Sequence, residues 1–512
     1  MKPRVRLLTP SLAAGSIVED NGLMKKLEQL NFDNTYTRLP EVFFERVMPT
    51  AFEKTHLVSF NPPAAELIDL DPDEAKRSEF HEAFGGKLLL PGSDPIAMLY
   101  SGHQFGHYVP QLGDGRAILL GEVRNSRGEK WDLQLKGAGV TRFSRDGDGR
   151  AVLRSTVREY LCGEAIHGLE IPTTRSLCII GGNEGVLRER PEQGAMLIRM
   201  APTHVRFGSF EVFFYRKQHE HLKTLADYVI AEHFPHLING SDTYARFLAE
   251  VARRTGVMIA HWQAVGWAHG VMNTDNMSIL GLTLDYGPYG FMDDFNPAFV
   301  PNHSDNQGRY SFQNQPDVGY WNIRALAQAL SPLLEEADVL GAPEIYEETM
   351  LKTYADLMQA KLGLQETHEG DDKLRKDLFA QMHSNHVDFT NFFRALGNFT
   401  QDDPAANSEI RDQFLDREGF DWWAERYQAR LKAEHSVDAD RKIRMDKCNP
   451  KYILRNYLVQ VAIQRATEQQ DYSEIDRLLE LLRHPFDDQP EMNDYAAPPP
   501  DWGKRLVVSC SS

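Results

Sequence analysis

The sequence predicts an α+β fold of two lobes, a β-rich first lobe followed by a helical second lobe. Between residues 112 and 200, short apolar runs alternate with glycine-containing turns, which is typical of strands. From about residue 220, apolar residues recur at helical spacing, as in the stretch YARFLAEVARRTGVMIAHWQAV. A chain of 512 residues is long enough to form two such lobes with extensions.

The composition excludes several classes of protein. Hydrophobic residues make up 42% of the chain and charged residues 25%, the balance of a globular protein. No apolar run approaches the length of a membrane span, and a net charge of −18 disfavours nucleic acid as a partner. The four cysteines are too few and too scattered for a disulfide framework or a zinc knuckle. We therefore expect a cytoplasmic protein, or one of an organellar matrix, with no membrane and no nucleic-acid partner.

The first lobe contains a predicted strand and a predicted helix. In WDLQLKG, residues 131–137, apolar and polar side chains alternate, which indicates a half-buried strand with Lys136 on its polar face. The stretch STVREYLCGEAIHG, residues 155–168, has helical patterning and ends at a glycine. On that helix Glu159 shares a largely apolar stripe with Ile166, so its carboxylate needs a cationic partner.

The tetrapeptide GDGR occurs twice, at 113–116 and at 147–150. Glycines let backbone N–H groups approach phosphate oxygens, and an adjacent arginine adds charged donors. Either copy by itself could equally be an ordinary turn. The second copy also resembles the start of a calcium loop, but Arg150 and Val157 stand where that loop needs oxygen ligands.

The stretch HGVMNTDNMSILGLTLDYGPYGF, residues 269–291, resembles the catalytic segment of protein kinases. In kinases H-R-D-x-x-x-x-N is followed by D-F-G; the first Asp is the catalytic base, and the Asn and the second Asp hold magnesium. His269, Asn276 and Asp285 keep that order, but Val271 stands at the position of the base. A valine cannot accept a proton, so the segment lacks the catalytic aspartate of a kinase at its usual position.

Other residues reproduce the running order of a kinase. The glycine-rich turn at 113–116 precedes Lys136 and then Glu159, and in kinases the lysine binds phosphates while the glutamate holds the lysine. Arg199 and Arg206 follow a β-like run, and such arginines suit bidentate phosphate contacts, although a pair like this is often ordinary surface.

The kinase-like segment also contains candidate metal ligands and a candidate base. Asn276 and Asp285 lie nine residues apart across a strand-like stretch, so their oxygens could meet over one hard cation. Asp275 is the only acidic residue between His269 and Asp285, which makes it the candidate general base. It could equally support a metal ligand or be a solvated loop acid. Asn276 alone could be a turn residue.

The motif GHQFGH at residues 102–107 has the spacing of a zinc-binding histidine pair. Gly102 and Gly106 disfavour a helix there, and no glutamate follows as it does in zinc proteases. We expect no metal role for His103 and His107.

Four long blocks carry a more specific resemblance. YSGHQFGHYVPQLGDGRAILLGEV, WDLQLKGAGVTRFSRDGDGRAVLRSTVREYL, GAMLIRMAPTHVRFGSFE and VGWAHGVMNTDNMSILGLTLDYGPYGFMDDF resemble the signature blocks of the selenoprotein O family of protein adenylyltransferases. With NHSDNQGRYSFQNQP, the match extends from roughly residue 30 to 335. The resemblance implies a pseudokinase that binds ATP turned around relative to a kinase and transfers AMP to hydroxyl side chains of proteins. The resemblance also implies that Val271 does not impair activity, because the α-phosphate and not the γ-phosphate faces the acceptor, so a base at the kinase position is not needed.

The resemblance implies roles for individual residues. Asp275 would be the proton acceptor, Asn276 and Asp285 would bind Mg²⁺ or Mn²⁺, and Glu159 would pair with Lys136. The nucleotide contacts would be Gly113, Gly115, Arg116, Lys136, Asp148, Gly149, Arg199, Arg206 and Asp285. Some members carry selenocysteine three residues from the end, where this chain has Cys510, so a redox role for that thiol is a further hypothesis.

The fold expected is a bilobal protein-kinase-like (pseudokinase) fold. We expect an N-terminal extension and the start of the first lobe at 1–100, a nucleotide-binding region at 101–205, a helical lobe at 206–400, a helical extension at 401–495 and a flexible tail at 496–512. Two alternatives to protein adenylylation stay open. One is an ordinary ATP-dependent phosphotransferase with Asp275 as a displaced base, and the other is a catalytically silent nucleotide-binding scaffold.

Overall fold

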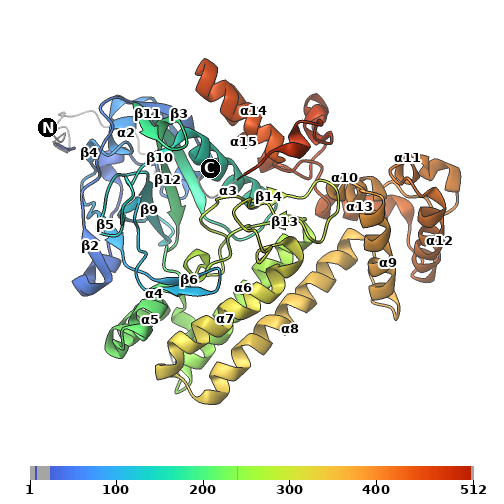
Figure 1. The fold of residues 1–512 in the computed structure, drawn as a ribbon, viewed down its shortest axis with the longest axis horizontal. Helices are drawn as coiled ribbons and strands as arrows, with labels where there is room; N and C mark the ends of the chain where they lie inside the picture. The colour runs from blue at the N-terminus through green and yellow to red at the C-terminus, as the bar shows by residue number, and fades with distance from the viewer. Residues whose placement is uncertain (1–5, 9–23, 239, 509–512) are drawn as a thin grey trace.

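A computed structural model describes residues 6–8, 24–238 and 240–508 (Figure 1). The centre of this part of the chain is an antiparallel sheet of eight strands in the order β2-β5-β8-β9-β12-β11-β3, with β10 beside β12. The bounds of these strands are Phe44–Arg46 (β2), Thr55–Phe60 (β3), Ile96–Met98 (β5), Ala117–Arg124 (β8), Lys130–Lys136 (β9), Ala151–Val152 (β10), Arg175–Leu187 (β11) and Pro191–Ala201 (β12). The predicted α+β class is confirmed.

Within the described residues, three pairs of short strands lie outside this sheet. They are Arg6–Leu7 (β1) with Leu88–Leu89 (β4), Gly102–Gln104 (β6) with His107–Val109 (β7), and Trp267–Ala268 (β13) with Gly290–Phe291 (β14).

Alternation along the strands gives the sheet two different faces. Leu133 and Leu135 of β9 belong to a buried apolar core on one face. Gln134 and Lys136 point to the other face, because successive side chains of a strand alternate. Strand β12 pairs with β9 so that Arg199 lies opposite Gln134, which puts a third polar side chain on this same face.

The prediction that this strand is half-buried is wrong. Its polar face is buried as well: Gln134 has no exposed surface and Asp132 is almost completely buried. The reason is that side chains from other segments cover it: Asp114 and Arg199 bind Gln134, and His204 binds Asp132. Glu159 of helix α3, Leu153–Gly168, pairs with Lys136. The alternation of apolar and polar residues in this strand therefore reflects two buried faces, one packed in an apolar core and one in a polar interior, and no face is exposed to solvent.

Helix α3 occupies the place predicted for a helix at 155–168 and begins two residues earlier. The stripe that contains Glu159 and Ile166 is buried, as predicted. The opposite side of α3 packs against α15, Ser473–Arg483, whose Leu478 and Leu482 belong to the same core. Segments from opposite ends of the chain thus meet at this helix (Figure 1).

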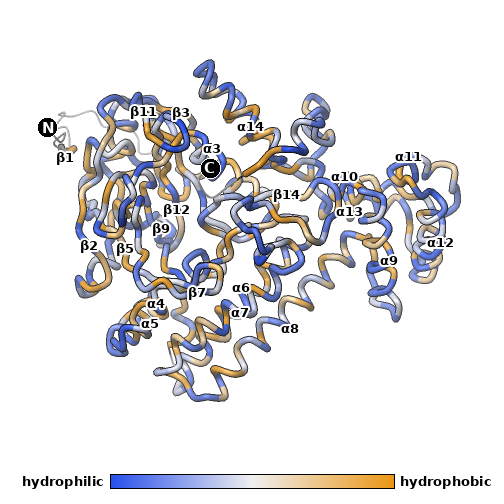
Figure 2. Tube along the Cα trace, in the orientation of Figure 1, coloured by the Kyte–Doolittle hydropathy of each residue, from blue (hydrophilic) through white to orange (hydrophobic). Residues whose placement is uncertain are grey.

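The rest of the described chain is mainly helical. Helices α6, α7 and α8 lie side by side, and α9 to α13 extend beyond their end around a separate apolar core (Figure 1). Hydrophobic and hydrophilic residues alternate along α8 (Figure 2), as expected for a helix with one packed face. None of the described helices combines the length and the apolar composition needed to span a membrane.

The bounds of the other helices follow in chain order. They are Pro62–Glu66 (α1), Ser78–Ala83 (α2), Phe207–Tyr215 (α4), His219–His233 (α5), Thr243–Ala264 (α6), Gln315–Leu330 (α7), Glu336–Lys361 (α8), Asp371–Ser384 (α9), Phe389–Leu396 (α10), Ser408–Arg411 (α11), Arg417–Ala433 (α12), Asp438–Cys448 (α13) and Asn456–Gln464 (α14).

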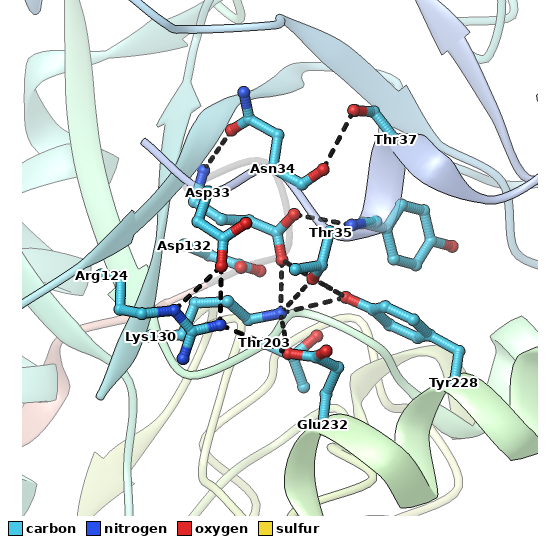
Figure 3. Close-up of polar contacts among 12 residues, drawn as sticks. Asp33, Asn34, Thr35, Thr37, Arg124, Lys130, Asp132, Thr203, Tyr228 and Glu232 are labelled. Atoms are coloured by element: carbon cyan, nitrogen blue, oxygen red, sulfur yellow. Dashed lines mark hydrogen bonds and ion pairs between the residues drawn. The ribbon is translucent and has the colours of Figure 1, made fainter. Parts of the chain in front are cut away.

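A buried polar cluster fastens the segment before β2 and helix α5 to the sheet (Figure 3). The ammonium group of Lys130 lies 2.7 Å from Glu122 and 3.1 Å from Glu232 of α5. Beside it, Arg124 of β8 pairs with Asp33 at 2.8 Å. Lys130 and Glu122 are buried, where an ionised group is stable only when it is paired, whereas Arg124, Asp33 and Glu232 are partly exposed.

The strand-like stretch predicted between Asn276 and Asp285 is not a strand. It is irregular chain with single bridges at Ser278 and Thr283. Its apolar residues, including Ile279, are buried in the main core without a neighbouring strand to pair with. The apolar pattern in the sequence reflects this burial.

The C-terminal segment contacts the helical part as far as it is described. Lys504 pairs with Asp294 at 2.9 Å, and the Trp502 ring packs against Tyr457. Cys510, for which a redox role is a hypothesis, lies outside the described residues.

Candidate active site

A cavity of about 880 Å³ lies where the sheet meets the segment 271–288. Most of the residues singled out in the sequence line it, although they come from distant parts of the chain. These are Gly113, Gly115, Arg116, Lys136, Asp148, Gly149, Arg199, Asp275, Asn276 and Asp285. Glu159 and Arg206 do not line the cavity; both are buried behind its wall and contact residues that do.

Lys136 and Glu159 form an ion pair across the interface of β9 and α3. The predicted need of Glu159 for a cationic partner is met twice, because Arg199 also lies 3.0 Å from its other oxygen. Burial lowers the pKa of Lys136 to about 8, although the Glu159 carboxylate opposes that shift. The charged form of Lys136 is therefore destabilised by burial at the cavity wall, and an anion bound in the cavity would stabilise it.

Asp285 is held by two arginines. Arg199 pairs with one carboxylate oxygen and Arg206 with the other. Burial alone would raise the pKa of Asp285, but the positive charges of Arg199 and Arg206 outweigh it and hold that pKa well below its usual range. Asp285 also adopts a left-handed backbone conformation, with φ of 59°. Such conformations are uncommon outside glycine and concentrate at functional sites.

Gln134 completes this arrangement and was missed in the sequence. Its amide oxygen accepts a hydrogen bond of 3.0 Å from Nε of Arg199, and its amide nitrogen donates to Asp114 at 3.2 Å. The signal was present, because Gln134 alternates with Lys136 on the polar side of one strand.

Asp275 lies on a single turn of 3₁₀ helix, Thr274–Asn276. Its side chain is only 7% exposed, and Oδ1 has no hydrogen-bond partner within the described chain. Burial raises the pKa of Asp275 to about 7. A buried carboxylate with an unpartnered oxygen and a pKa near neutrality is suited to accepting a proton from a bound group.

Asn276 stands next to Asp275 and faces the same cavity. Its amide nitrogen donates to the carbonyl of Val271 at 2.9 Å, which leaves the amide oxygen as the atom free for a cation. Asp285 offers a carboxylate, whose oxygens have further lone pairs besides those that the arginines use. Nowhere in the described chain do three or more His, Cys, Asp or Glu residues gather as a metal site. These two oxygen donors fit a hard cation that takes its remaining ligands from phosphate and water.

The two copies of GDGR lie side by side. Ser144, just before the second copy, donates a hydrogen bond from its hydroxyl to the carbonyl of Gly115 in the first. Gly113 has φ of 76°, and a Cβ atom there would come 2.4 Å from the Phe143 ring. Glycine is therefore required where the two loops touch. Arg116 beside them is exposed at the cavity.

Asp148 of the second copy pairs with Arg188 at 2.7 Å. The hydrogen bond from Arg188 lowers the pKa of Asp148. Arg188 also lines the cavity and was missed, because nothing in the sequence distinguishes it from the neighbouring charged residues of that turn.

The two kinase-like positions differ in role. His269 is buried, and its Nε2 lies 3.0 Å from the carbonyl oxygen of Leu284, so it connects the two halves of the segment. Val271 lines the cavity and offers no titratable group. Nδ1 of His103 lies 3.0 Å from a carboxylate oxygen of Glu211.

The site combines a cationic wall with one proton acceptor. Arg116, Lys136 and Arg199 line one side of the cavity and suit a polyanion such as a triphosphate. Asp275 lies on the side of the cavity that is formed by the segment 271–288. The arrangement can bind a nucleotide and take a proton from a second substrate.

Comparisons with known proteins agree with this chemistry. A family model described as "Protein adenylyltransferase SelO" matches residues 26–483. The chain is 60% identical to "Protein nucleotidyltransferase YdiU" of Myxococcus xanthus (strain DK1622) over 489 residues, which cover 96% of this chain and 100% of that protein. Proteins of the same name from Thiobacillus denitrificans (strain ATCC 25259 / T1) and Pseudomonas fluorescens (strain Pf0-1) are 55% and 50% identical, each over 96% of this chain and 100% of their own length. The chain therefore belongs to the SelO family, as the resemblance of its sequence blocks predicted.

Proposed function

We propose that this protein transfers AMP from ATP to Ser, Thr or Tyr hydroxyls of other proteins and releases pyrophosphate. The predicted class of enzyme, a protein nucleotidyltransferase, is the class that the family description and the names of the relatives give. The observation that carries the proposal is the position of Asp275. This acidic side chain lines the cavity, while Val271 occupies the place where a kinase has its base.

The fold that we infer is the bilobal, kinase-like pseudokinase fold with the segment boundaries expected from the sequence. The antiparallel sheet, the Lys136–Glu159 ion pair on it and the helical remainder support this assignment. In this view the β-rich lobe and segment 271–288 enclose the nucleotide.

The nucleotide would be held by the cationic wall and by the glycine loops. Lys136, Arg199 and Arg116 supply positive charge for the phosphates. Arg206 does not line the cavity; it pairs with Asp285, which does. Gly113, Gly115, Asp148 and Gly149 supply backbone and carboxylate contacts from the two adjacent loops. Each of these roles is a proposal that rests on position and charge.

Asn276 and Asp285 would hold Mg²⁺ or Mn²⁺, and a bound cation would neutralise charge on the phosphate oxygens. Asp275 would accept the proton of the attacking hydroxyl. The hydroxyl oxygen forms a bond to the α-phosphorus, the bond between the α-phosphorus and the bridging oxygen breaks, and pyrophosphate leaves with that electron pair. Arg199 and Lys136 would orient the phosphates for this in-line attack.

The location and the excluded partners are also part of the proposal. A cytoplasmic protein without nucleic-acid partners agrees with the net charge and with three cysteines that are free in the structure, Cys162, Cys178 and Cys448. The acceptor proteins would share only an accessible Ser, Thr or Tyr hydroxyl group.

The experiment that tests the proposal uses ATP labelled at either the α- or the γ-phosphate, with Mg²⁺ or Mn²⁺ present. We expect label on protein from the α-position alone. Label from the γ-position would show an ordinary phosphotransferase instead. Binding of ATP without transfer of either label would show a silent scaffold. The Asp275→Asn variant serves as the matched control, because it keeps the shape of the side chain and removes the proton acceptor.

A further inference from the structure

The β6–β7 hairpin, which contains the motif GHQFGH, packs directly against the turn that carries Asp275. The amide of His103 donates a hydrogen bond of 2.7 Å to the hydroxyl of Thr274. A Cβ atom on Gly102 would come 2.7 Å from the unpartnered carboxylate oxygen of Asp275. Only glycine lets the strand approach the carboxylate this closely, so the hairpin and the turn form one unit.

Gln104 is the hairpin residue that reaches the carboxylate. Its amide nitrogen donates to Oδ2 of Asp275 at 3.4 Å, and Gln104 itself lines the cavity. The other carboxylate oxygen, Oδ1, is buried against the hairpin backbone at Gly102 and has no hydrogen-bond partner within the described chain. The hairpin therefore contacts both oxygens of the carboxylate and sets its orientation at the cavity.

Phe105 occupies the tip of the hairpin in an unusual state. It has φ of 50°, a conformation that is rare for a bulky residue, and its side chain is 38% exposed. Its backbone N–H donates two hydrogen bonds that hold it there, to Asn273 Oδ1 at 3.2 Å and to the Tyr310 hydroxyl oxygen at 2.9 Å. An exposed aromatic ring in a strained backbone, kept by specific bonds, indicates a contact surface.

The hairpin side of the cavity differs in charge from the nucleotide side. Its lining residues, apart from Asp275, are uncharged: Tyr100, Gln104, Phe105, Leu112, Val271 and Asn273. The cations that suit phosphates, Arg116, Lys136 and Arg199, come instead from the first GDGR copy and from strands β9 and β12. The uncharged side therefore suits a polypeptide segment better than it suits a triphosphate.

We propose that the β6–β7 hairpin is the acceptor-binding wall of the active site. Gln104 is a positioning residue that orients the Asp275 carboxylate, and the Phe105 ring contacts the segment of the protein substrate that presents the hydroxyl. This inference rests on the proposed function, because it assigns the second substrate of the same reaction.

The Phe105→Gly variant tests the contact without disturbing the fold. Glycine accepts the left-handed conformation readily, so the substitution removes the ring and relieves strain while it keeps the amide hydrogen bonds. The probe acceptor is dephosphorylated casein, an unfolded protein with many hydroxyl side chains, and the donor is α-labelled ATP. We expect the KM for casein to rise at least fivefold and the KM for ATP to stay unchanged. Lys217→Gly is the matched control, because Lys217 is exposed, has φ of 57° and does not line the cavity.

The Gln104→Glu variant tests the positioning role. It keeps the size of the side chain, removes the N–H donor and places a second negative group beside Asp275. We expect kcat to fall at least tenfold while the KM values for ATP and casein stay within twofold. Because a smaller fraction of folded enzyme would give the same split, kcat is expressed per ATP-binding site measured by titration, and thermal unfolding of the variant should match that of the wild type. Gln111→Glu, on the exposed chain after the hairpin, is the control and should retain wild-type kcat.

The outcomes separate this inference from the function on which it rests. An unchanged KM for casein in Phe105→Gly, or an unchanged kcat in Gln104→Glu, overturns the inference while wild-type transfer of α-label leaves the proposed function standing. Absence of α-label on casein and on the enzyme itself, in the wild type, overturns both. If the wild type labels only itself and not casein, the rate of self-labelling is measured in place of the kinetic constants for casein. We then expect this rate to fall at least fivefold in Phe105→Gly and at least tenfold in Gln104→Glu.

Discussion

Arg206 and Asp285 form an ion pair between the buried interior and the cavity wall. Arg199 binds the other oxygen of the same carboxylate, so Asp285 stays ionised in a place where burial would favour its neutral form. A permanently charged carboxylate at the cavity is what a divalent cation requires. The arginines thus prepare Asp285 for a metal while they contribute positive charge to the same wall.

Loss of Asp285 should remove most of the AMP transfer. We expect the Asp285→Asn variant to lose at least about 10²-fold in kcat, because the phosphates then lack the main ligand of their counter-ion. Chelation of divalent cations should abolish transfer by the wild type, and added Mg²⁺ or Mn²⁺ should restore it. The measurement is the rate of α-label transfer, with thermal unfolding as a control for Arg206, which loses its carboxylate partner, while Arg199 keeps Glu159. Activity of the variant near that of the wild type would contradict the assignment.

Lys136 should matter for ATP and little for folding. In the Lys136→Met variant we expect the KM for ATP to rise about tenfold or more, because a charged phosphate partner is worth roughly 1.5–3 kcal/mol. The fold should survive, since Glu159 keeps its second partner, Arg199, at 3.0 Å. Steady-state kinetics with varied ATP check the first expectation, and chemical unfolding checks the second. An unchanged KM for ATP would show that Lys136 does not contact the nucleotide.

The buried cluster of Figure 3 should be a major contributor to stability. Replacing Lys130 by Met leaves the buried Glu122 without a cation, and breaking a buried ion pair in this way costs about 3–5 kcal/mol. The partly exposed Glu232 keeps Arg124 at 3.8 Å. Lys223→Met is the matched control, because its pair with Asp227 is exposed and the loss should stay within about 0.5 kcal/mol. Urea unfolding of both variants measures the difference. Equal losses in the two variants would refute the structural role of Lys130.

Lys361 should make the stability depend on alkaline pH. Burial lowers its pKa to about 8 from an ordinary value of 10.5, while its ammonium group rests on the Phe393 ring and binds Asn449. Between pH 8 and 10.5 the unfolded chain binds a proton here that the folded protein does not. The free energy of unfolding therefore gains from rising pH in this window, and the full penalty for burying the charge remains below pH 8.

The Lys361→Met variant lacks this contribution. The free energy of unfolding of the wild type, relative to that of the variant, should increase by about 2 kcal/mol between pH 8 and pH 10. Urea unfolding at several pH values measures it, and other titrating groups cancel in the difference. Parallel pH profiles for the two proteins would show that Lys361 titrates normally.

Several local features could be predicted because they depend on neighbouring residues alone. The helix that carries Glu159 and the strand that carries Lys136 follow from side-chain periodicity, and both lie where expected. The requirement for a cationic partner of Glu159 followed from its place on an apolar stripe. Candidate residues such as Asp275 and Asp285 could be named because their chemical types and order are unusual.

Other features depended on packing between distant segments. The strand predicted between Asn276 and Asp285 failed because apolar patterning reports burial and cannot show whether a partner strand exists. Gln134 and Arg188 were missed for a related reason: their importance comes from the residues that face them across the sheet and the adjacent loops.

By itself the sequence determined the α+β class, the helix and strand of the first lobe, the family and the set of residue types that a nucleotide and a metal require. Only the tertiary structure decided which of these side chains meet, that Asp285 is shared by two arginines, and that the hairpin of the motif GHQFGH lies against Asp275. The physical reason is range. Backbone propensity and side-chain alternation act over a few residues, whereas the charges and hydrogen bonds of the site join residues that are brought together only when the apolar cores pack.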